Sequence, residues 1–169
     1  KIERLDMNRM LAEIVASMKF SLEQAGATVQ LDALPPCYGD AVQVGQVFSN
    51  LLDNALKYLD PDRPGLIRVF AHQKRNEVLY CVKDNGIGID AAHQEAIFRL
   101  FHRLNPDRGD GQGLGLTIVR RVLDRQGGKI SLESAPNQGS TFFVSLPSKP
   151  LPDSTRAKRH RPSEPKVRK

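Results

Sequence analysis

Apolar residues recur along this chain with two different periods. In three segments they fall three and four residues apart, a spacing typical of helices that bury one face. These segments are residues 10–22, 41–58 and 117–126. Asp6 or Asn8 can cap the first helix and Asp40 the second, while glycines follow the first and the third. We therefore expect three main helices that face the core.

Shorter segments alternate between apolar and polar residues, as half-buried strands do. They are residues 28–31, 66–72, 77–83, 129–134 and 140–146. Turns at residues 74–76 and 136–139 predict that the second strand pairs with the third, and the fourth with the last. The stretch from Leu34 to Gly39 is rich in turn residues, so we expect only a connection there.

The strand expected at residues 77–83 runs into Asp84-Asn85-Gly86-Ile87-Gly88-Ile89. Side chains alternate along a strand, so Asp84 shares a face with apolar Val82 and Tyr80 and should point into the core. A carboxylate there needs a donor, and two glycines one residue apart let backbone come close to a ligand. The stretch therefore suits a flat heterocycle with an amino group. Asn85-Gly86 is also a common hairpin signal, and these residues alone leave both interpretations open.

Three polar residues share one edge of the helix expected at residues 41–58. At about 100° per residue, Asn50, Asn54 and Lys57 lie close together on the wheel, beside the apolar stripe. Any one of them is an ordinary boundary residue, but three along one edge of a core helix indicate a ligand. Two amide oxygens one turn apart can reach a single Mg²⁺, which prefers oxygen ligands.

Glycines also precede the helix expected at residues 117–126, in the run Gly111-Gln112-Gly113-Leu114-Gly115-Leu116. Alternate glycines at a helix start can direct several backbone N–H groups at one phosphate, and Gln112 can add a contact to phosphate or metal. A flexible hinge is the alternative interpretation. Neither the P-loop pattern nor the GxGxxG spacing is present. The preceding residues 104–109 lack any period, which predicts a mobile loop.

Composition predicts a soluble chain with one core. Of its 169 residues, 40% are hydrophobic and 26% are charged. No window approaches the roughly 18 uninterrupted apolar residues of a membrane-spanning helix. Cys37 and Cys81 have neither metal-site spacing nor a disulfide pattern, so a reduced, cytoplasmic setting fits best.

The formal net charge of +6 comes from residues 148–169, which hold eight Lys or Arg against Asp153 and Glu164. Residues 1–147 are therefore neutral and form the expected domain. The tail carries four prolines and hardly an apolar residue, which predicts disorder or a linker. A basic arm that binds nucleic acid is the alternative, disfavoured because no aromatic residue interleaves the charges.

In family order and spacing, several motifs resemble the successive boxes of the catalytic, ATP-binding domain of sensor histidine kinases. They are NLLDNALKY, DNGIG, residues 98–103, GQGLGL and GSTF. The wider superfamily includes gyrase, heat-shock chaperone ATPases and MutL. The resemblance covers residues 1–147 and implies an α+β fold, a two-layer α/β sandwich of the Bergerat type. It implies a mixed, mostly antiparallel sheet with three main helices on one face, and ATP held under a lid that is short, as in the phytochrome-like branch.

The resemblance also implies a role for each matching residue. Asn54, assisted by Asn50, would bind Mg²⁺, Lys57 would contact phosphate, and Asp84 would read the adenine amino group. Arg103 and Arg108 are candidate lid contacts to phosphate. The residues implied for catalysis are Asn50, Lys57 and Arg103. Those implied around the nucleotide are Asn50, Asn54, Lys57, Tyr58, Asp84, Gly86, Gly88, Ile89, Gly111, Gln112, Gly113, Leu114, Gly115, Leu116 and Thr141, the last closing the adenine pocket.

One position separates two chemistries within this superfamily. Gyrase-like members carry a glutamate where Asn50 stands, and a carboxylate there can activate water, whereas an amide cannot. An attacking imidazole nitrogen needs no such base. Asn50 therefore favours phosphotransfer to histidine over ATP hydrolysis. A hydrolytic ATPase and a degenerate, nucleotide-regulated binding module stay open as alternatives.

None of the chain's histidines has the surroundings of a phosphoacceptor in this family. They are His72, His93, His102 and His160. We therefore expect the acceptor on a separate dimerisation domain of a parent kinase, which signals to a response regulator and can be membrane-anchored. The chain itself is expected to be monomeric, without contact to nucleic acid or membrane.

Overall fold

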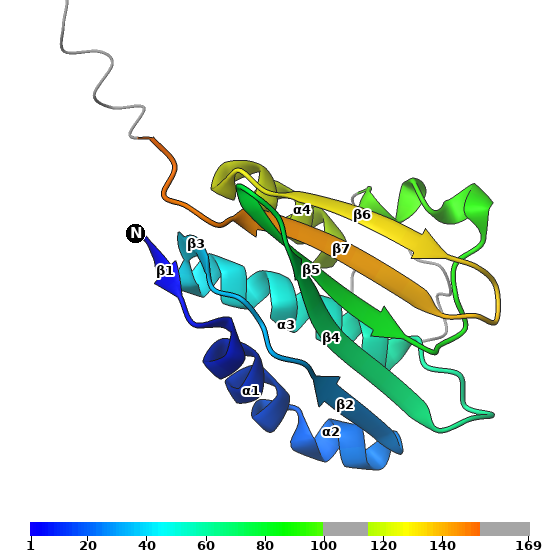
Figure 1. Ribbon diagram of the computed structural model, residues 1–169. Helices are drawn as coiled ribbons and strands as arrows, with labels where there is room; N and C mark the ends of the chain where they lie inside the picture. Colours follow the sequence, from blue (N-terminus) through cyan, green and yellow to red (C-terminus); the bar gives the residue numbers. More distant parts are fainter. Residues whose placement is uncertain (100–114, 153–169) are drawn as a thin grey trace, which may run out of the picture.

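A five-stranded sheet forms one layer of the molecule (Figure 1). The computed structural model describes residues 1–99 and 115–152. The strands are β2 (Ala27–Leu31), β4 (Gly65–Gln73), β5 (Glu77–Asp84), β6 (Lys129–Ser134) and β7 (Ser140–Pro147). Their order is β2-β4-β5-β7-β6, with β2 and β4 parallel and the other neighbours antiparallel. The sheet is mixed and mostly antiparallel, as the resemblance implied.

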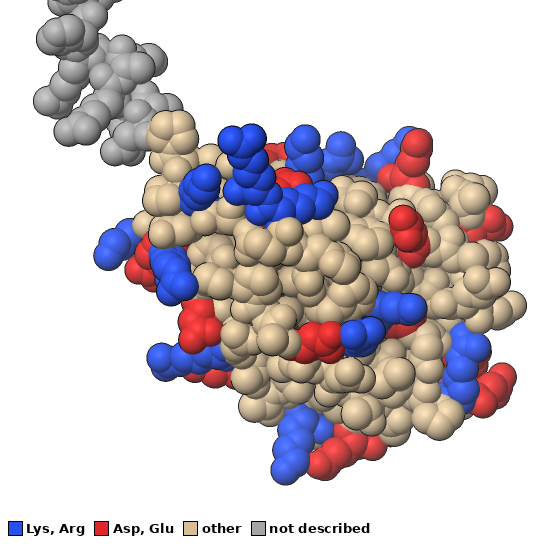
Figure 2. Space-filling view, in the orientation of Figure 1, with Lys and Arg blue, Asp and Glu red and all other residues tan. Residues whose placement is uncertain are grey.

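Helices cover one face of this sheet (Figure 1). They are α1 (Met7–Ser17), α2 (Lys19–Gln24), α3 (Ala41–Lys57) and α4 (Gly115–Gln126), with the short turns η1 (Ala91–His93) and η2 (Ala96–Phe98). The apolar stripe of α3 is buried, and Phe48 meets Tyr80 of β5 edge to face at 5.5 Å between ring centroids. The two-layer α/β sandwich is therefore confirmed. Charged side chains lie mostly around the margin of the face shown in Figure 2.

Two short strands outside the main sheet were not expected. β1 (Ile2–Leu5) pairs antiparallel with β3 (Cys37–Asp40), where the turn-rich sequence predicted only a connection. That prediction was wrong because β3 depends on a partner far away in the sequence. The pair leads into α3, since Asp40 ends β3 and its carboxylate accepts a hydrogen bond from Gln43 N at 3.1 Å. The cap predicted at Asp40 is confirmed.

The first predicted helix is two helices, which break at Met18. The Ser17 hydroxyl donates to the Ile14 carbonyl at 2.6 Å, a local bond of the kind that bends helices. Asp6 is the cap, because its Oδ1 accepts from Arg9 N at 3.1 Å. Asn8 instead bonds both the N–H and the C=O of Leu34 and ties α1 to the chain before β3.

Candidate functional site

Asp84 ends β5 with its side chain inside the molecule. Only 5% of the residue is exposed, and it follows Tyr80 and Val82 on the face that α3 covers, as the alternation predicted. Its Oδ1 accepts hydrogen bonds from Gly86 N at 2.9 Å and Ser140 N at 3.3 Å. Within the described residues both donors reach the same oxygen, which leaves Oδ2 available to a donor from a ligand.

Burial raises the pKa of the Asp84 carboxyl to about 6, although the backbone N–H groups of Gly86 and Ser140 oppose that rise. The ionised form is therefore costly in this environment. A donor that reaches Oδ2 would favour ionisation and would gain a strong, charge-assisted hydrogen bond. Buried carboxyls with raised pKa values are typical of binding and catalytic sites.

The backbone of two other segments packs closely against the glycine turn after Asp84. A Cβ atom at Gly86 would lie 2.2 Å from the Tyr58 carbonyl oxygen, and one at Gly88 would lie 1.9 Å from that of Ala135. Gly88 also has a φ of +72°, which favours glycine. Ile87 N donates to Tyr58 O at 3.0 Å. These positions tolerate only glycine, because the turn docks against the end of α3 and the β6–β7 turn.

The hairpin interpretation of this turn does not hold. β5 pairs with β4 on one side and β7 on the other, so the residues after Gly88 do not return along it. Asn85 faces the start of β4 instead, where its amide accepts from Leu66 N at 2.8 Å and donates to Pro64 O at 2.9 Å. The turn is therefore fixed by contacts to distant segments.

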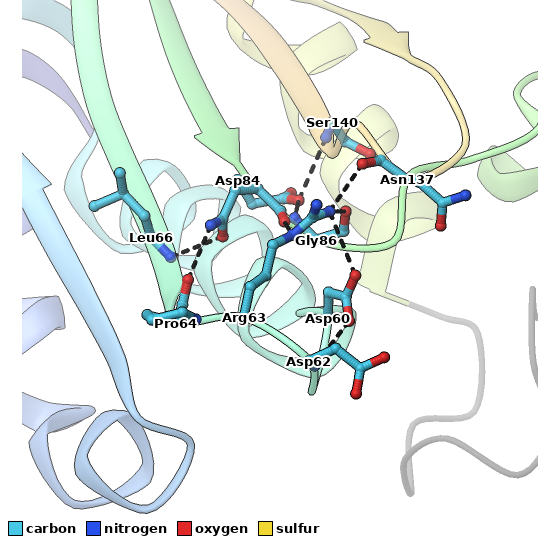
Figure 3. Close-up of polar contacts among 10 residues, drawn as sticks. Asp60, Asp62, Arg63, Pro64, Leu66, Asp84, Gly86, Asn137 and Ser140 are labelled. Atoms are coloured by element: carbon cyan, nitrogen blue, oxygen red, sulfur yellow. Dashed lines mark hydrogen bonds and ion pairs between the residues drawn. The ribbon is translucent and has the colours of Figure 1, made fainter.

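Arg63 clamps this turn from outside (Figure 3). Its guanidinium donates to the carbonyl oxygens of Asn85, Gly86 and Asn137 at 2.8, 2.8 and 2.9 Å. The same guanidinium forms an ion pair with Asp60, with 3.5 Å between Arg63 Nη2 and Asp60 Oδ2. Arg63 thus joins the segment after α3, the glycine turn and the β6–β7 turn. In the sequence Arg63 lies between Pro61 and Pro64, a stretch that predicts only the end of the preceding helix. No local pattern there indicates the contacts that Arg63 makes.

Asn50 and Asn54 lie half-buried along one edge of α3, as the helical wheel predicted. The amide nitrogen of Asn50 is buried and has no hydrogen-bond partner in the described part of the chain. A Cβ atom at Gly115 would lie 3.9 Å from Asn50 Cγ, so this amide faces the first residue of α4. A half-turn of the amide would present its oxygen to the same space. Two amide oxygens beside a helix start fit the oxygen preference of Mg²⁺.

Lys57 and Tyr58 lie at the end of α3, next to these amides. The Lys57 ammonium pairs with Asp53 at 3.0 Å and is more than a third exposed. An exposed pair of this kind contributes little, so Lys57 can leave Asp53 for a phosphate. Tyr58 is half-buried, and its carbonyl closes the glycine turn. Ile89 is buried beyond the turn, where its N–H donates to Ser134 Oγ at 2.7 Å.

The register of β5 and β7 places Ser140 and Thr141 on opposite faces of the sheet. Ser140 stands opposite Asp84 in the β5–β7 pair, whereas Thr141 stands opposite Lys83. Alternate residues face opposite sides of a sheet, so Ser140, not Thr141, lies beside Asp84. The implied contribution of Thr141 to the adenine pocket stays a prediction, and Ser140 is the residue of β7 beside Asp84, buried and hydrogen-bonded to Ser134 at 2.8 Å between hydroxyl oxygens. The alternation that located Asp84 could have located Ser140 only once the register was known.

Several predicted site residues lie outside the described residues. They are Arg103, Arg108, Gly111, Gln112, Gly113 and Leu114. Their roles stay predictions. Gly115 and Leu116 are the first residues of α4, which packs beside α3 next to Asn50. The structure therefore brings together the glycine turn, the amide edge of α3 and the start of α4.

A family model described as histidine kinase-, DNA gyrase B- and HSP90-like ATPase matches residues 39–150. The chain belongs to this family. Cyanobacterial phytochrome B of Nostoc sp. is 39% identical over 144 residues, which cover 83% of this chain and 19% of that protein. The phytochrome-like protein Cph1 of Synechocystis sp. is 35% identical over 143 residues, which cover 84% of this chain and 19% of that protein. The adaptive-response sensory kinase SasA of Synechocystis sp. is 39% identical over 132 residues, which cover 76% of this chain and 34% of that protein.

Solved structures of histidine kinases share the fold of this ATPase domain. The mycobacterial sensor histidine kinase MprB superposes with a TM-score of 0.75 at 25% identity, and the match covers 89% of this chain and 100% of that one. Full-length ShkA in complex with AMPPNP superposes with a TM-score of 0.77 at 23% identity, and the match covers 90% of this chain and 32% of that one. The chain is thus a histidine kinase-type ATP-binding domain, as its motifs indicated.

The chain spans 19% of the length of its phytochrome relatives. Across residues 1–99 and 115–152, no helix is long and apolar enough to cross a membrane. The same ranges contain no group of three or more His, Cys, Asp or Glu side chains that could hold a metal ion.

We expect Asp84→Asn to make the free protein more stable at pH 8. The pKa of Asp84 is higher in the folded than in the unfolded chain, so its stabilising contribution is present below about pH 4 and is lost as the pH rises through about 6. Asparagine keeps an acceptor for Gly86 and Ser140 and removes the buried charge. Urea unfolding should show a gain on the order of 2 kcal/mol at pH 8 that disappears by about pH 4. Asp62→Asn, at an exposed position, is the control and should show no such dependence.

We expect Arg63→Ala to lower the free energy of unfolding by about 2 kcal/mol, because three backbone carbonyls lose a charged donor. Arg63→Lys should restore less than half of that loss, since an ammonium cannot reach all three as a planar fork does. Urea denaturation measures both variants. Arg75→Ala, at an exposed residue without a hydrogen bond or ion pair in the described ranges, is the matched control. Equal effects at Arg63 and Arg75 would show that the clamp contributes nothing.

Proposed function

We propose that this domain binds Mg-ATP and transfers the γ-phosphoryl group to a histidine on a separate dimerisation domain, in two-component signal transduction. The observation that carries this proposal is the buried Asp84 carboxylate, with one oxygen committed to backbone N–H groups and the other available. The amide side chains of α3 and the first residue of α4 lie next to this turn. A nucleotide whose base contacts Asp84 would place its phosphates near them.

Each described site residue has a part in holding this ligand. Asp84 Oδ2 accepts a hydrogen bond from the adenine amino group, and Ser140 lines the adenine side of the pocket. Asn54 and Asn50 hold Mg²⁺ through their amide oxygens, and Lys57 exchanges Asp53 for a phosphate oxygen. Magnesium, when bound, neutralises charge on the phosphates. Arg103, Arg108 and the glycines of residues 111–115 are proposed phosphate contacts on sequence grounds.

Phosphotransfer is favoured over hydrolysis by the chemistry of Asn50. In the transfer, an imidazole nitrogen forms a bond to the γ-phosphorus while the bond to the β–γ bridging oxygen breaks, and the electron pair leaves with ADP. The attacking nitrogen uses its own lone pair, so the protein has to align it and stabilise charge. Attack by water would require a base, and the amide of Asn50 cannot accept the proton.

The partners follow from this function. The acceptor histidine belongs to a dimerisation domain of the parent kinase, and a response regulator receives the phosphoryl group from it. Relatives named as sensory or regulatory kinases support this assignment. We place the domain in the cytoplasm, where ATP and a response regulator are available, whether or not the parent is anchored in a membrane.

We expect Asp84→Asn to weaken Mg-ATP and Mg-ADP binding at least tenfold, because an amide cannot offer a charged acceptor to the adenine amino group. Asn54→Ala should weaken binding in the presence of Mg²⁺ but leave the weak, metal-free affinity unchanged. Isothermal titration calorimetry with and without Mg²⁺ separates these effects. Asp62→Asn should bind as the unmodified chain does. An unchanged affinity in Asp84→Asn would remove Asp84 from the nucleotide site.

We expect the chain alone to remain unlabelled by γ-labelled ATP, because its histidines lack the surroundings of an acceptor. Addition of a separate dimerisation hairpin from a related kinase should produce acid-labile, base-stable phosphohistidine on that hairpin. Gel autoradiography after acid and base treatment measures both reactions. Self-labelling of the chain would contradict the proposal, and steady phosphate release without a hairpin would favour a hydrolytic ATPase.

A further inference from the structure

A cleft of about 660 Å³ opens between α4, β6 and residues 94–99, and it shares no residue with the nucleotide site. Its floor is apolar and is formed by Phe98, Leu123, Ile130 and Leu132. Its rim is charged and is formed by Glu95, Arg99, Arg120, Asp124 and Lys129. A hydrophobic floor with a polar rim is typical of a surface that receives a side chain from a partner.

Cations outnumber carboxylates at this surface. Arg99, Arg120 and Lys129 line the cleft against Glu95 and Asp124, and Arg121 and Arg125 are exposed elsewhere on α4. In the described part of the chain, none of these five cations makes a hydrogen bond or ion pair. They are Arg99, Arg120, Arg121, Arg125 and Lys129. Figure 2 shows Lys and Arg gathered along the edge of the molecule that carries α4 and β6. This edge therefore complements an acidic ligand.

The cleft lies beside a free sheet edge. Among residues 1–99 and 115–152, β6 is the last strand of the sheet and pairs only with β7, in unbroken register. Alternate N–H and C=O groups of such a strand point outward and can pair with another chain. At the end of β6, Gln94 Nε2 donates to Ser134 O at 2.9 Å. Residues 129–133 contain neither a proline nor a bulge that would block pairing.

One extended segment can use all three features. A strand added to β6 continues the sheet, and every second side chain of that strand then faces the helix layer. Ile130 and Leu132 face that layer and line the cleft floor. A helix-facing side chain of the added strand would thus enter the cleft between Leu123 and Phe98. An acidic side chain two residues along would meet Arg120 on the same face, and an adjacent acidic side chain would meet Lys129 on the other face.

We propose that the cleft and the free edge of β6 form a docking site for an extended, acidic segment of a protein partner. This segment pairs with β6, inserts an apolar side chain into the cleft and places carboxylates on its cationic rim. The site is independent of the proposed phosphotransfer, because none of its residues belongs to the nucleotide site.

Charge disfavours two other occupants. Residues 148–169 of this chain hold eight Lys or Arg against two acids, so they are repelled by the cations of the rim. A nucleic-acid backbone would meet the cations, but it would also meet Glu95 and Asp124 and would leave the apolar floor unfilled. The floor and the free strand edge together fit a polypeptide better.

The test uses the whole 169-residue chain and two fluorescent peptides of about ten residues, the length of a long strand. One peptide carries a central Leu or Val among Asp and Glu residues, so that acids lie on both faces of the strand, and the other carries Lys or Arg in place of the acids. Fluorescence anisotropy at physiological salt should show the acidic peptide binding at least tenfold more tightly. Arg120→Glu combined with Lys129→Glu should weaken that binding at least tenfold. Arg75→Glu combined with Lys83→Glu, the same charge change at exposed positions elsewhere, should leave it within about twofold.

Hydrogen exchange followed by NMR decides whether the strand edge takes part. The acidic peptide should slow exchange of alternate amides in residues 129–133, and nucleotide affinity should be the same with and without it. Peptide binding without protection of β6 would overturn the proposal. Equal binding of an oligothymidylate would show a general polyanion surface, and amides already protected in the free chain would show that the chain covers its own edge. Both of these results would also overturn it.

Discussion

The buried carboxylate of Asp84 is the constraint on which the site depends. The fold holds an ionisable group on the core face of β5, where burial raises its pKa to about 6 and the only described donors are two backbone N–H groups on one oxygen. A neutral amide there would keep both hydrogen bonds without the cost of a buried charge. Sites that give up stability in this way are typical of binding functions.

The backbone around Asp84 keeps that geometry rigid. Gly86 and Gly88 leave room for carbonyl oxygens from two other segments, and a Cβ atom at Gly139 would lie 2.0 Å from the Asp84 carbonyl oxygen. Arg63 then links the same segments by hydrogen bonds to three carbonyl oxygens. The turn is therefore preorganised, so little conformational entropy would be lost when a ligand binds.

α4 joins the two proposed binding surfaces. Its first residue, Gly115, faces Asn50 at the nucleotide site, whereas Arg120 and Asp124 line the cationic cleft at the edge of β6. The buried side chains of α4 hold it against the sheet, and Gln126 at its end accepts from Asp40 N at 2.9 Å. One helix thus contributes residues to both proposed surfaces.

Local patterns in the sequence determined much of this structure. The period of α3, the alternation of β5, the cap at Asp40 and the inward direction of Asp84 follow from neighbouring residues, because helix and strand geometry repeat over a few positions. Tertiary structure decided the pairing of β1 with β3, the contacts of Arg63 and the position of Ser140 beside Asp84. These depend on register and on contacts between residues far apart in the chain, for which no local period exists.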